Sequence, residues 1–296
     1  MPATSATSVV PVLACHDRLA DPNVLWTPLR EHGVVLLRGA AFSAMAFEAA
    51  TAPFAEHFRV HQDPTRRGYN PADTTQSVTA GEEAIALHAE RAYLPGPPEL
   101  LFFCCVTPPK SGGETTICDG AAIVDRLSPE DVRALDAMTL TWQSTLDKAR
   151  WRRLYHTDDP ALAATLFSAS IAIHGEKSRT RYWFDEDDAL HVDYHAPSLI
   201  AGRISGRKAF ANYLLLSAVE PSGPRATQRD GSPVPDDLLR RVADVAESIT
   251  TDIAWLRGDV AIIDNTRCLH GRRAFSGGAR EILTRMGDAR LPVTVG

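Results

Sequence analysis

Two histidines and a glutamate, placed in two distant motifs, are the residues best suited to chemistry in this chain. His88 and Glu90 are separated by a single residue, and His270 lies far along the chain in the segment 265–271. Residues two apart on a strand point to the same side, so His88 and Glu90 can reach one ion if their segment is a strand. With His270 they would supply two imidazoles and one carboxylate. Such a set leaves coordination positions open, which is typical of non-heme Fe(II) oxygenases.

Each motif also has a more ordinary interpretation. The chain has 10 histidines, and a histidine separated from a glutamate by one residue often arises by chance. A structural histidine is therefore the default interpretation of His88 or His270 alone. A zinc hydrolase also uses two histidines and a glutamate. His191 and His195 suggest a second metal site, but Pro197 and the aromatic residues nearby favour a loop there.

The composition is that of a globular protein with 296 residues, of which 44% are hydrophobic and 23% charged. This length can bury a sizeable core in one large domain or two small ones. The formal net charge of -6 and the absence of a Lys/Arg stripe disfavour a nucleic-acid partner. No apolar run is long enough to cross a bilayer, and residues 1–5 lack the features of a signal peptide. Five cysteines without a C-x-x-C pair are typical of a reduced, cytoplasmic protein.

The elements expected around the motifs are strands and amphipathic helices. Between them, the polar segment 59–81 is predicted to be a loop that leads to His88, and loops on a rigid scaffold often carry binding residues. The predicted strands lie at 34–38, within 101–118, and at 139–145, 179–184, 255–263 and 280–286; the predicted helices lie at 26–32, 43–58, 119–137 and 235–250.

Two longer motifs complete the pattern. Residues 108–116 follow a buried strand and have the sequence Pro-Pro-Lys-Ser-Gly-Gly-Glu-Thr-Thr. Residues 258–272 begin with Gly-Asp-Val, continue through Asp-Asn and end with His-Gly-Arg. Together with residues 88–90, and in this order, these motifs resemble the TauD/TfdA family of Fe(II)- and 2-oxoglutarate-dependent dioxygenases. The closest likeness is to its natural-product branch, which includes clavaminate synthase-like enzymes, and it extends from residue 31 to about residue 285.

The resemblance implies an α+β fold. Its core would be a double-stranded β-helix, which is a cupin-like jelly roll, with flanking helices and a helical insertion over the mouth of the barrel. We therefore expect one dioxygenase domain over residues 1–296, with an insertion or lid at about 125–250. Without the resemblance, strands at both ends with helices between them predict only a mixed α and β fold.

The resemblance also implies a cofactor site. Fe(II) would be held by His88, Glu90 and His270, and the enzyme would consume 2-oxoglutarate as co-substrate together with O₂. The far carboxylate of 2-oxoglutarate needs a fixed cation, and arginine suits it because a planar guanidinium makes two parallel charge-assisted bonds. The family places this arginine shortly after the second histidine, where the chain offers Arg280 and Arg285.

We favour Arg280 because the local pattern Gly-x-x-Arg-x-Ile-Leu is the one that the resemblance predicts. On a regular strand Arg280 and Arg285 would face opposite sides, so only one of them should reach the cofactor. The Gly-Gly-Glu-Thr motif makes Thr115 the candidate hydroxyl for the same carboxylate. Thr115 has an equally good interpretation as an ordinary strand residue.

The implied function is hydroxylation of an unactivated C–H bond in a small, amino-acid- or peptide-derived molecule of secondary metabolism. The same ligands would also support desaturation, cyclisation or epoxidation, and they do not distinguish these outcomes. A non-catalytic jelly-roll binding protein is a further alternative, which the complete ligand set disfavours. The sequence leaves the oligomeric state open.

The expected pocket walls, by analogy, are the segments 59–78, 142–153 and 183–195. The basic run 150–153 is either a solvated helix face or a clamp for a substrate carboxylate. In the second case Trp142 and Trp151 would wall the carbon skeleton.

Overall fold

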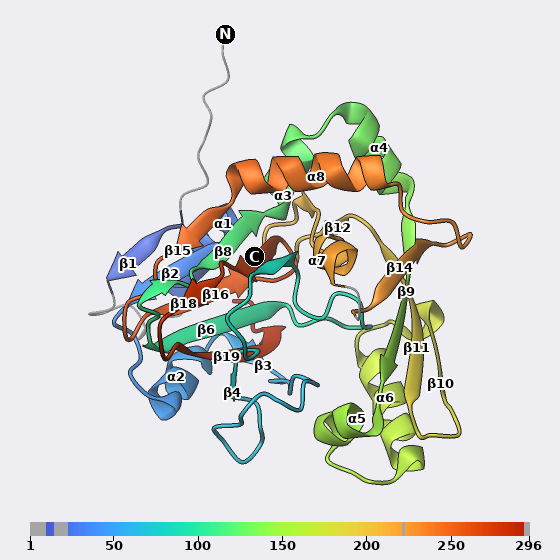
Figure 1. The fold of residues 1–296 in the computed structure, drawn as a ribbon, viewed down its shortest axis with the longest axis horizontal. Helices are drawn as coiled ribbons and strands as arrows, with labels where there is room; N and C mark the ends of the chain where they lie inside the picture. The colour runs from blue at the N-terminus through green and yellow to red at the C-terminus, as the bar shows by residue number, and fades with distance from the viewer. Residues whose placement is uncertain (1–9, 15–22, 221–222, 293–296) are drawn as a thin grey trace.

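The computed structural model describes residues 10–14, 23–220 and 223–292, which form two packed barrel sheets and a separate lid sheet (Figure 1). In spatial order, the large barrel sheet comprises β1 (Val12–Ala14), β2 (Val34–Arg38), β16 (Val260–Asp264), β6 (Leu100–Thr107), β19 (Glu281–Ala289) and β3 (Ala55–Glu56), with β4 (Gln76–Ser77) also paired to β19. The small barrel sheet comprises β15 (Thr251–Ile253), β8 (Thr115–Asp119), β17 (Cys268–Arg272) and β5 (Ile85–His88).

The barrel is a mostly antiparallel jelly roll whose large sheet is buried on both faces. Leu100 and Phe102 pack on one side with the first two helices, α1 (Asn23–His32) and α2 (Ala44–Thr51). Leu101 and Phe103 face the other way and pack with Ile117 of the small sheet. Because both faces of β6 are buried, its sequence is a continuous apolar run rather than an alternating one.

The lid sheet contains β10 (Thr180–Phe184), β11 (Leu190–Pro197), β9 (Thr139–Leu146) and β14 (Arg225–Gln228), in that order. Two helices, α5 (Lys148–Tyr155) and α6 (Pro160–Ile173), pack beside this sheet, and we call the sheet and these two helices the lid. The remaining elements are α3 (Gly120–Arg126), α4 (Pro129–Ala137), α7 (Leu214–Val219), α8 (Asp236–Ile249), the 3-10 turn at Lys177–Arg179, and the short pairs β7 (Ser111–Gly112) with β18 (Phe275–Ser276) and β12 (Ile200–Ala201) with β13 (Lys208–Ala209).

The segment 125–250 is therefore not purely helical, which corrects the expectation of a helical insertion. It includes the four-stranded antiparallel lid sheet, and its last helix, α8, packs against α3 and β8 of the barrel (Figure 1). The apolar period that predicts α8 is real, but its apolar face covers the barrel. The strands at 139–145 and 179–184 were expected from the sequence and are present as β9 and β10.

Local sequence signals fix several element ends. Gly33 follows α1 with φ +75°, and a Cβ there would meet Cys268 Sγ at 2.4 Å, so glycine is required on two counts. Ser43 caps α2 by accepting a hydrogen bond from the Ala46 amide at 3.2 Å. The helix ends at Thr51 rather than at residue 58, because residues 55 and 56 pair with β19 as β3.

No helix in the described ranges is long and apolar enough to cross a membrane. Cys104, Cys105, Cys118 and Cys268 are buried free thiols, as expected for small core residues. Residues 1–5, on which the signal-peptide expectation depends, and Cys15 lie outside the described ranges. The cytoplasmic location therefore stays a prediction.

Candidate metal centre and active site

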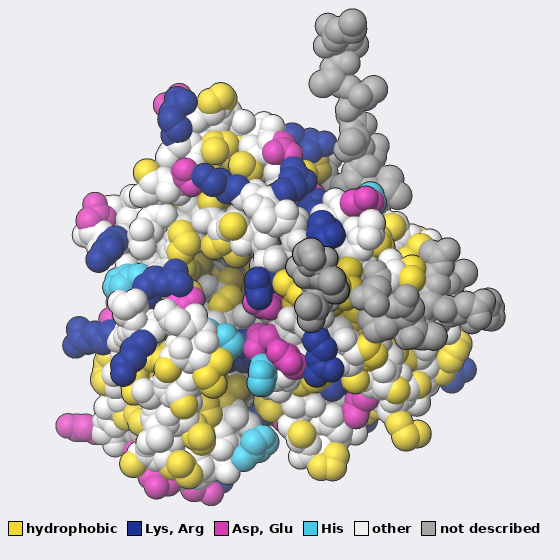
Figure 2. Space-filling view, turned by 180° about the vertical axis from the view of Figure 1, so that it is seen from behind, with side chains coloured by type: hydrophobic (Ala, Val, Ile, Leu, Met, Phe, Trp, Pro, Cys, Tyr) yellow, Lys and Arg dark blue, Asp and Glu magenta, His cyan; other side chains and the backbone are white. Residues whose placement is uncertain are grey.

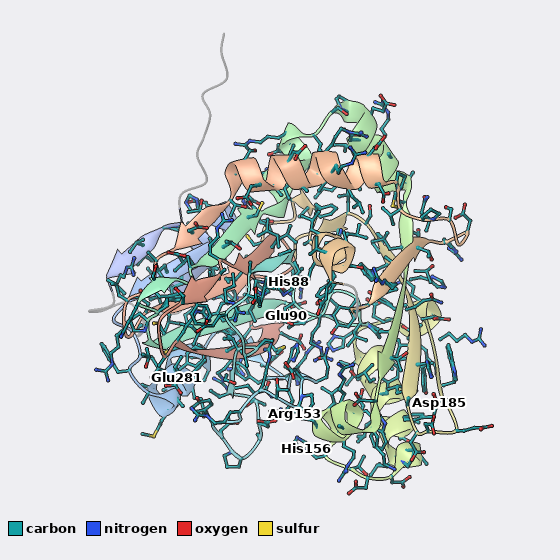
Figure 3. The ribbon with its side chains drawn as sticks, in the orientation of Figure 1. His88, Glu90, Arg153, His156, Asp185 and Glu281 are labelled. Atoms are coloured by element: carbon teal, nitrogen blue, oxygen red, sulfur yellow. The ribbon has the colours of Figure 1, made fainter. Side chains whose placement is uncertain are left out.

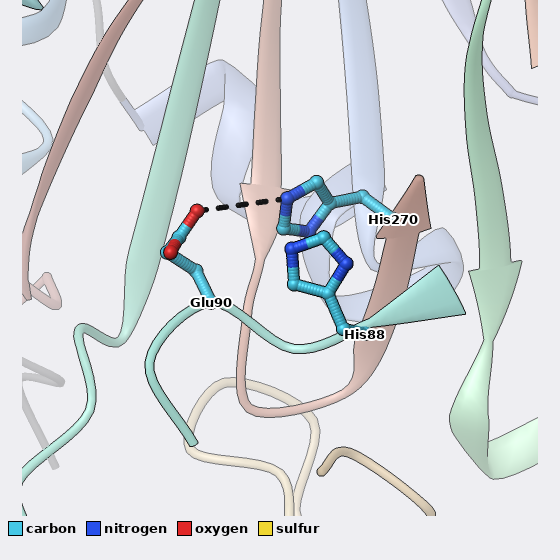
Figure 4. A group of neighbouring side chains, drawn as sticks. All are labelled: His88, Glu90 and His270. Atoms are coloured by element: carbon cyan, nitrogen blue, oxygen red, sulfur yellow. Dashed lines mark ion pairs between the residues drawn. The ribbon is translucent and has the colours of Figure 1, made fainter. Parts of the chain in front are cut away.

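Strand pairing brings the two distant histidines together. In the antiparallel pair of β5 and β17, His88 stands directly opposite His270. Residues opposite each other on neighbouring strands have their side chains on the same face, and here the two ring centroids are 4.2 Å apart (Figure 4). Both imidazoles are buried.

Glu90 reaches the histidines in a different way from the one that its spacing suggests. Strand β5 ends at His88, and Glu90 lies in the turn that follows. Its backbone amide donates to Asn265 Oδ1 at 2.7 Å, and Asn265 Nδ2 donates to the carbonyls of Glu90 at 3.1 Å and Pro98 at 2.8 Å. The amide side chain of Asn265 thus clips the Glu90 turn to the chain just before β17, so the expected strand geometry at Glu90 is wrong although the expected proximity holds.

The three side chains form one compact donor set. One ligand atom from each of His88, Glu90 and His270 lies within 4.8 Å of the others, and Glu90 Oε2 is 3.7 Å from His270 Nε2 (Figure 4). His88 Nδ1 is 2.9 Å from the Ala86 carbonyl, so a proton on Nδ1 leaves Nε2 with a free lone pair. His270 Nδ1 is buried without a hydrogen-bond partner among the described residues.

Burial and charge set the protonation states that a cation needs. Burial lowers the pKa of His88, and burial together with the neighbouring His88 lowers the pKa of His270 well below its usual range. Burial alone would raise the pKa of Glu90, but the hydrogen bond and charge of His61, with Arg66 and His270, hold it well below its usual range. Two neutral imidazoles beside an ionised carboxylate fit a single divalent ion, because metal ligands must be deprotonated.

The His-Gly-Arg motif around His270 has a structural reason at each position. Strand β17 runs between β5 and β8, and a Cβ at Gly271 would meet the Ile85 carbonyl oxygen at 2.5 Å and Thr116 Oγ1 at 2.7 Å. Arg272 donates to the carbonyls of Thr79 at 3.0 Å and Glu83 at 2.7 Å. These bonds hold the segment that leads into β5, and with it His88.

The donor set opens on a cavity of about 1060 Å³ between the barrel and the lid. His88 and Glu90 lie near the middle of the molecule, between the barrel sheets and the lid sheet (Figure 3). Seen from behind, this face has a hollow near its middle that is bordered by basic, acidic and histidine side chains (Figure 2). The cavity is large enough for a small organic substrate together with a co-substrate.

Comparisons with known proteins agree with this geometry. Residues 17–286 match the model of the taurine catabolism dioxygenase TauD, TfdA family. The chain belongs to the TauD/TfdA dioxygenase family. It is 27% identical over 272 residues to a clavaminate synthase-like protein of Arabidopsis thaliana, covering 83% of this chain and 79% of that protein. It is 25% identical over 278 residues to the dapdiamide synthesis protein DdaC of Enterobacter agglomerans, with coverages of 84% and 80%.

A solved structure shows the same fold. PvcB of Pseudomonas aeruginosa, an Fe- and α-ketoglutarate-dependent oxygenase from an isonitrile synthetic pathway, superposes with a TM-score of 0.56 at 18% identity, covering 93% of this chain and 84% of that one. The family assignment identifies this TauD/TfdA member as a dioxygenase that depends on Fe(II), 2-oxoglutarate and O₂. Its sequence relatives place it in the natural-product branch.

The two arginines considered for 2-oxoglutarate point to different places. Arg280 lies just before β19 and lines the cavity, and its Nε donates to the Gly113 carbonyl at 3.0 Å. Arg285 lies on β19 and faces α2 instead, with Nη1 2.6 Å from Thr51 Oγ1 and its guanidinium 3.7 Å above the Phe58 ring. The expected separation to opposite sides is therefore present.

Arg280 is a largely buried cation without an anionic partner among the described residues. Burial, and then the nearby charge of Arg272, lower its pKa to about 10, and it forms no ion pair with a described residue. Gly113, whose carbonyl orients it, has φ +72° in the Gly-Gly turn. Thr115 also lines the cavity, and its hydroxyl accepts a hydrogen bond from Trp255 Nε1 at 3.0 Å.

The segment 59–81 contributes two residues that the sequence did not single out. His61 Nε2 is 3.2 Å from Glu90 Oε1, and Arg66 Nη2 is 4.0 Å from Glu90 Oε2. Both side chains are buried, and Arg66 Nε has no partner among the described residues. They orient the Glu90 carboxylate. The only sequence signal for them is the position of this polar loop directly before the His88 motif.

Tyr93 and Tyr213 are further cavity residues that sequence reasoning missed. The edge of one ring meets the face of the other, with centroids 4.7 Å apart, and Tyr213 also contacts His88 at 5.3 Å. Burial raises the pKa of Tyr93 to about 12 and raises the pKa of Tyr213 further, so both hydroxyls stay protonated. No short motif marks them, because they come from a turn and from the start of α7.

The basic run on α5 divides between surface and cavity. Arg150 lines the cavity, whereas Arg152 pairs with Asp158 on the outside. Arg153 pairs with Asp73 at 2.8 Å and donates to the Asp63 carbonyl at 2.7 Å, which ties α5 to the loop 59–81. A clamp made from all three arginines is therefore wrong, and only Arg150 is placed to meet a substrate.

The expected walls are confirmed in part. Residues of the segments 59–78 and 142–153 line the cavity, but none of 183–195 does. Trp142 and Trp151 are fully buried in the core of the lid rather than exposed to the cavity. His191 pairs with Asp185 at 2.7 Å on the lid surface, and the described residues contain no second metal-ligand cluster beside the one at His88.

Proposed function

We propose that this dioxygenase hydroxylates an unactivated C–H bond in a small, amino-acid- or peptide-derived molecule of secondary metabolism, with His88, Glu90 and His270 as the Fe(II) ligands. The observation that carries the proposal is the buried donor set, whose atoms lie within 4.8 Å of one another at the wall of the cavity. Bound Fe(II) with 2-oxoglutarate and O₂ supplies the oxidising power, and 2-oxoglutarate leaves as succinate and CO₂.

Arg280 and Thr115 hold the far carboxylate of 2-oxoglutarate in this proposal. Arg280 supports it because its guanidinium is largely desolvated, lines the same cavity as the donor set and lacks an anionic partner among the described residues. A carboxylate there would complete a charge-assisted pair. Arg285 is assigned a structural role, since its Nη1 donates to the Glu48 carbonyl and the Thr51 hydroxyl of α2.

The cavity and the relatives support the proposed substrate class. A volume of about 1060 Å³ can enclose a small molecule but not a macromolecule. DdaC is a dapdiamide synthesis protein, and the Arabidopsis relative is clavaminate synthase-like. Both names support a natural-product substrate, and Arg150 at the cavity offers a partner for a substrate carboxylate.

The test begins with the anaerobic protein. Fe(II) and 2-oxoglutarate should together give a visible charge-transfer band, and O₂ should then yield succinate in amounts that rise with the right substrate. Candidate amino acids, small peptides and cyclic dipeptides are compared with mass detection of products. Addition of one oxygen atom to a substrate without a C=C bond supports hydroxylation, because epoxidation adds the same mass but needs an alkene. Loss of two hydrogen atoms would assign desaturation or cyclisation instead. Iron binding without any succinate would overturn the proposal.

A further inference from the structure

Glu220 is a carboxylate in the cavity that the proposed chemistry does not use. It follows α7 directly, is half-buried and lines the same cavity as the donor set. Its Oε2 accepts a hydrogen bond from the Tyr213 hydroxyl at 3.3 Å, and it forms no ion pair with any residue in the described ranges. Glu90, which lines the same cavity, instead faces the basic side chains of His61 and Arg66.

The surroundings of Glu220 are aromatic. Tyr213 stands between Glu220 and the metal ligands, with its ring 5.3 Å from that of His88 and 4.7 Å from that of Tyr93. Both tyrosines keep their protons, so neither competes as an anion. A lone carboxylate beside aromatic faces is a favourable site for an ammonium group, which gains a charge-assisted hydrogen bond and cation–π attraction together.

The position of Glu220 connects it to the reacting centre. Helix α7 packs against β5, the strand that ends at His88. A cation held at Glu220 would therefore sit beside the donor set rather than at the distant rim.

The same cavity also holds a basic side chain from the lid. Arg150 enters from α5 of the lid and is 48% exposed, with only a long contact of 3.8 Å to Asp147. Glu220 as an anionic anchor and Arg150 as a cationic anchor match a molecule with an ammonium and a carboxylate. Such a molecule would span the cavity with its carbon skeleton across the tyrosines.

We propose that Glu220, with the rings of Tyr93 and Tyr213, forms a subsite for a protonated primary amine, so that the substrate is a free amine rather than an acylated one. The inference rests on the proposed function and refines its substrate class. An amine seated at Glu220 fixes one end of the substrate and thereby selects which carbon faces the donor set. Replacing the carboxylate by a neutral amide would lower the affinity for the amine by roughly 10- to 100-fold, because a charged hydrogen-bond acceptor in a partly desolvated cavity is lost.

The experiment uses full-length protein loaded anaerobically with Fe(II) and 2-oxoglutarate. Matched probes are added, namely L-lysine, L-ornithine, L-2,3-diaminopropionate and dipeptides with a free amino terminus, each beside its N-acetylated form. Binding is followed by the change that each probe causes in the charge-transfer band. The free amines should perturb the band and the acetylated forms should not. Glu220→Gln should weaken the best amine by roughly 10- to 100-fold while its acetylated form stays unbound.

Glu83→Gln is the matched control. Glu83 also lines the cavity, but it is exposed and lies just before β5, where its backbone carbonyl rather than its carboxylate accepts from Arg272. This control should bind the amine as the unsubstituted protein does. Equal weakening in the two variants, equal binding of acetylated and free probes, or no response to any amine would overturn the subsite. Absence of the charge-transfer band in the unsubstituted protein would instead overturn the proposed function, and the subsite with it.

Discussion

The two walls of the cavity are built on different principles. The barrel wall holds its functional groups through strand pairing and buried hydrogen bonds, as in the His88–His270 pair and the Asn265 clip on Glu90. The lid wall stands on a separate sheet whose Trp142 is buried in a core shared with the barrel residues Ala89 and Leu269. It presents to the cavity side chains of β9, with Arg150 from the next helix. A rigid wall suits groups that must meet one ion, whereas a wall on a separate sheet can vary with the substrate.

The largest effects should come from the donor set of the barrel wall. His88→Ala, Glu90→Ala and His270→Ala should each abolish Fe(II) binding and turnover, because a site with only three protein ligands tolerates no loss. The fold should survive, since these side chains contribute no large apolar area. The charge-transfer band of the anaerobic Fe(II)–2-oxoglutarate complex is the readout. His191→Ala, a lid-surface histidine, is the control, and a band that persists in any of the three would remove that residue from the ligand set.

The next largest effect should separate Arg280, which lies just before β19, from Arg285, which lies on that strand. Arg280→Ala should weaken 2-oxoglutarate by about 100-fold, since a desolvated carboxylate would lose its charged partner. Arg285→Ala should leave 2-oxoglutarate affinity nearly unchanged but lower the free energy of unfolding, because it removes hydrogen bonds to Glu48 and Thr51. Titration of both variants with 2-oxoglutarate, alongside thermal unfolding, decides the assignment. A larger loss of affinity in Arg285→Ala would reverse it.

A smaller but more specific effect is expected at Asn265. Asn265→Ala should reduce Fe(II) affinity by roughly 10- to 100-fold, because the Glu90 turn loses the amide that positions it. Asn212 is a matched control: it is also buried, and its side chain bonds to the Ser198 carbonyl and the Leu214 amide. Asn212→Ala should lower stability without changing Fe(II) affinity in a calorimetric titration. Equal Fe(II) affinity in the two variants would show that the clip has only a structural role.

The difference between the walls also explains what the sequence could predict. The proximity of His88, Glu90 and His270 could be predicted because they lie in short motifs. In the His270 motif the neighbouring glycine and arginine have fixed structural tasks, with Gly271 between two strands and Arg272 on the carbonyls before β5. Two longer elements were predicted from their apolar patterns. Strand β2 has the predicted bounds, and helix α8 differs from its prediction by a single residue at each end.

Sequence reasoning failed where three-dimensional contacts override local pattern. Glu90 lies off the strand because Asn265, distant in sequence, holds its turn. Trp142 and Trp151 are aromatic and near a basic run, which suggested a pocket wall, but alternation along β9 turns Trp142 into the lid core. His61 lies in a loop, Tyr93 in a turn and Tyr213 at the start of α7. In such segments no periodicity of the sequence indicates which side chain faces the cavity.

The smallest predicted effect belongs to the lid wall. Arg150→Ala should raise the KM for a carboxylate-bearing substrate by a few-fold, because a half-exposed guanidinium contributes on the order of 0.5–1 kcal/mol to an ion pair. Arg152 lies two residues further along α5 and is paired with Asp158 outside the cavity. Arg152→Ala is therefore the matched control and should not change the KM. Both variants should keep the charge-transfer band, because neither touches the barrel wall. A methyl-ester form of the same substrate sharpens the test, since its KM should be the same with and without Arg150. If Arg150→Ala weakened the acid and the ester equally, the lid would act by shape alone, and the charge of Arg150 would have no role in choosing the substrate.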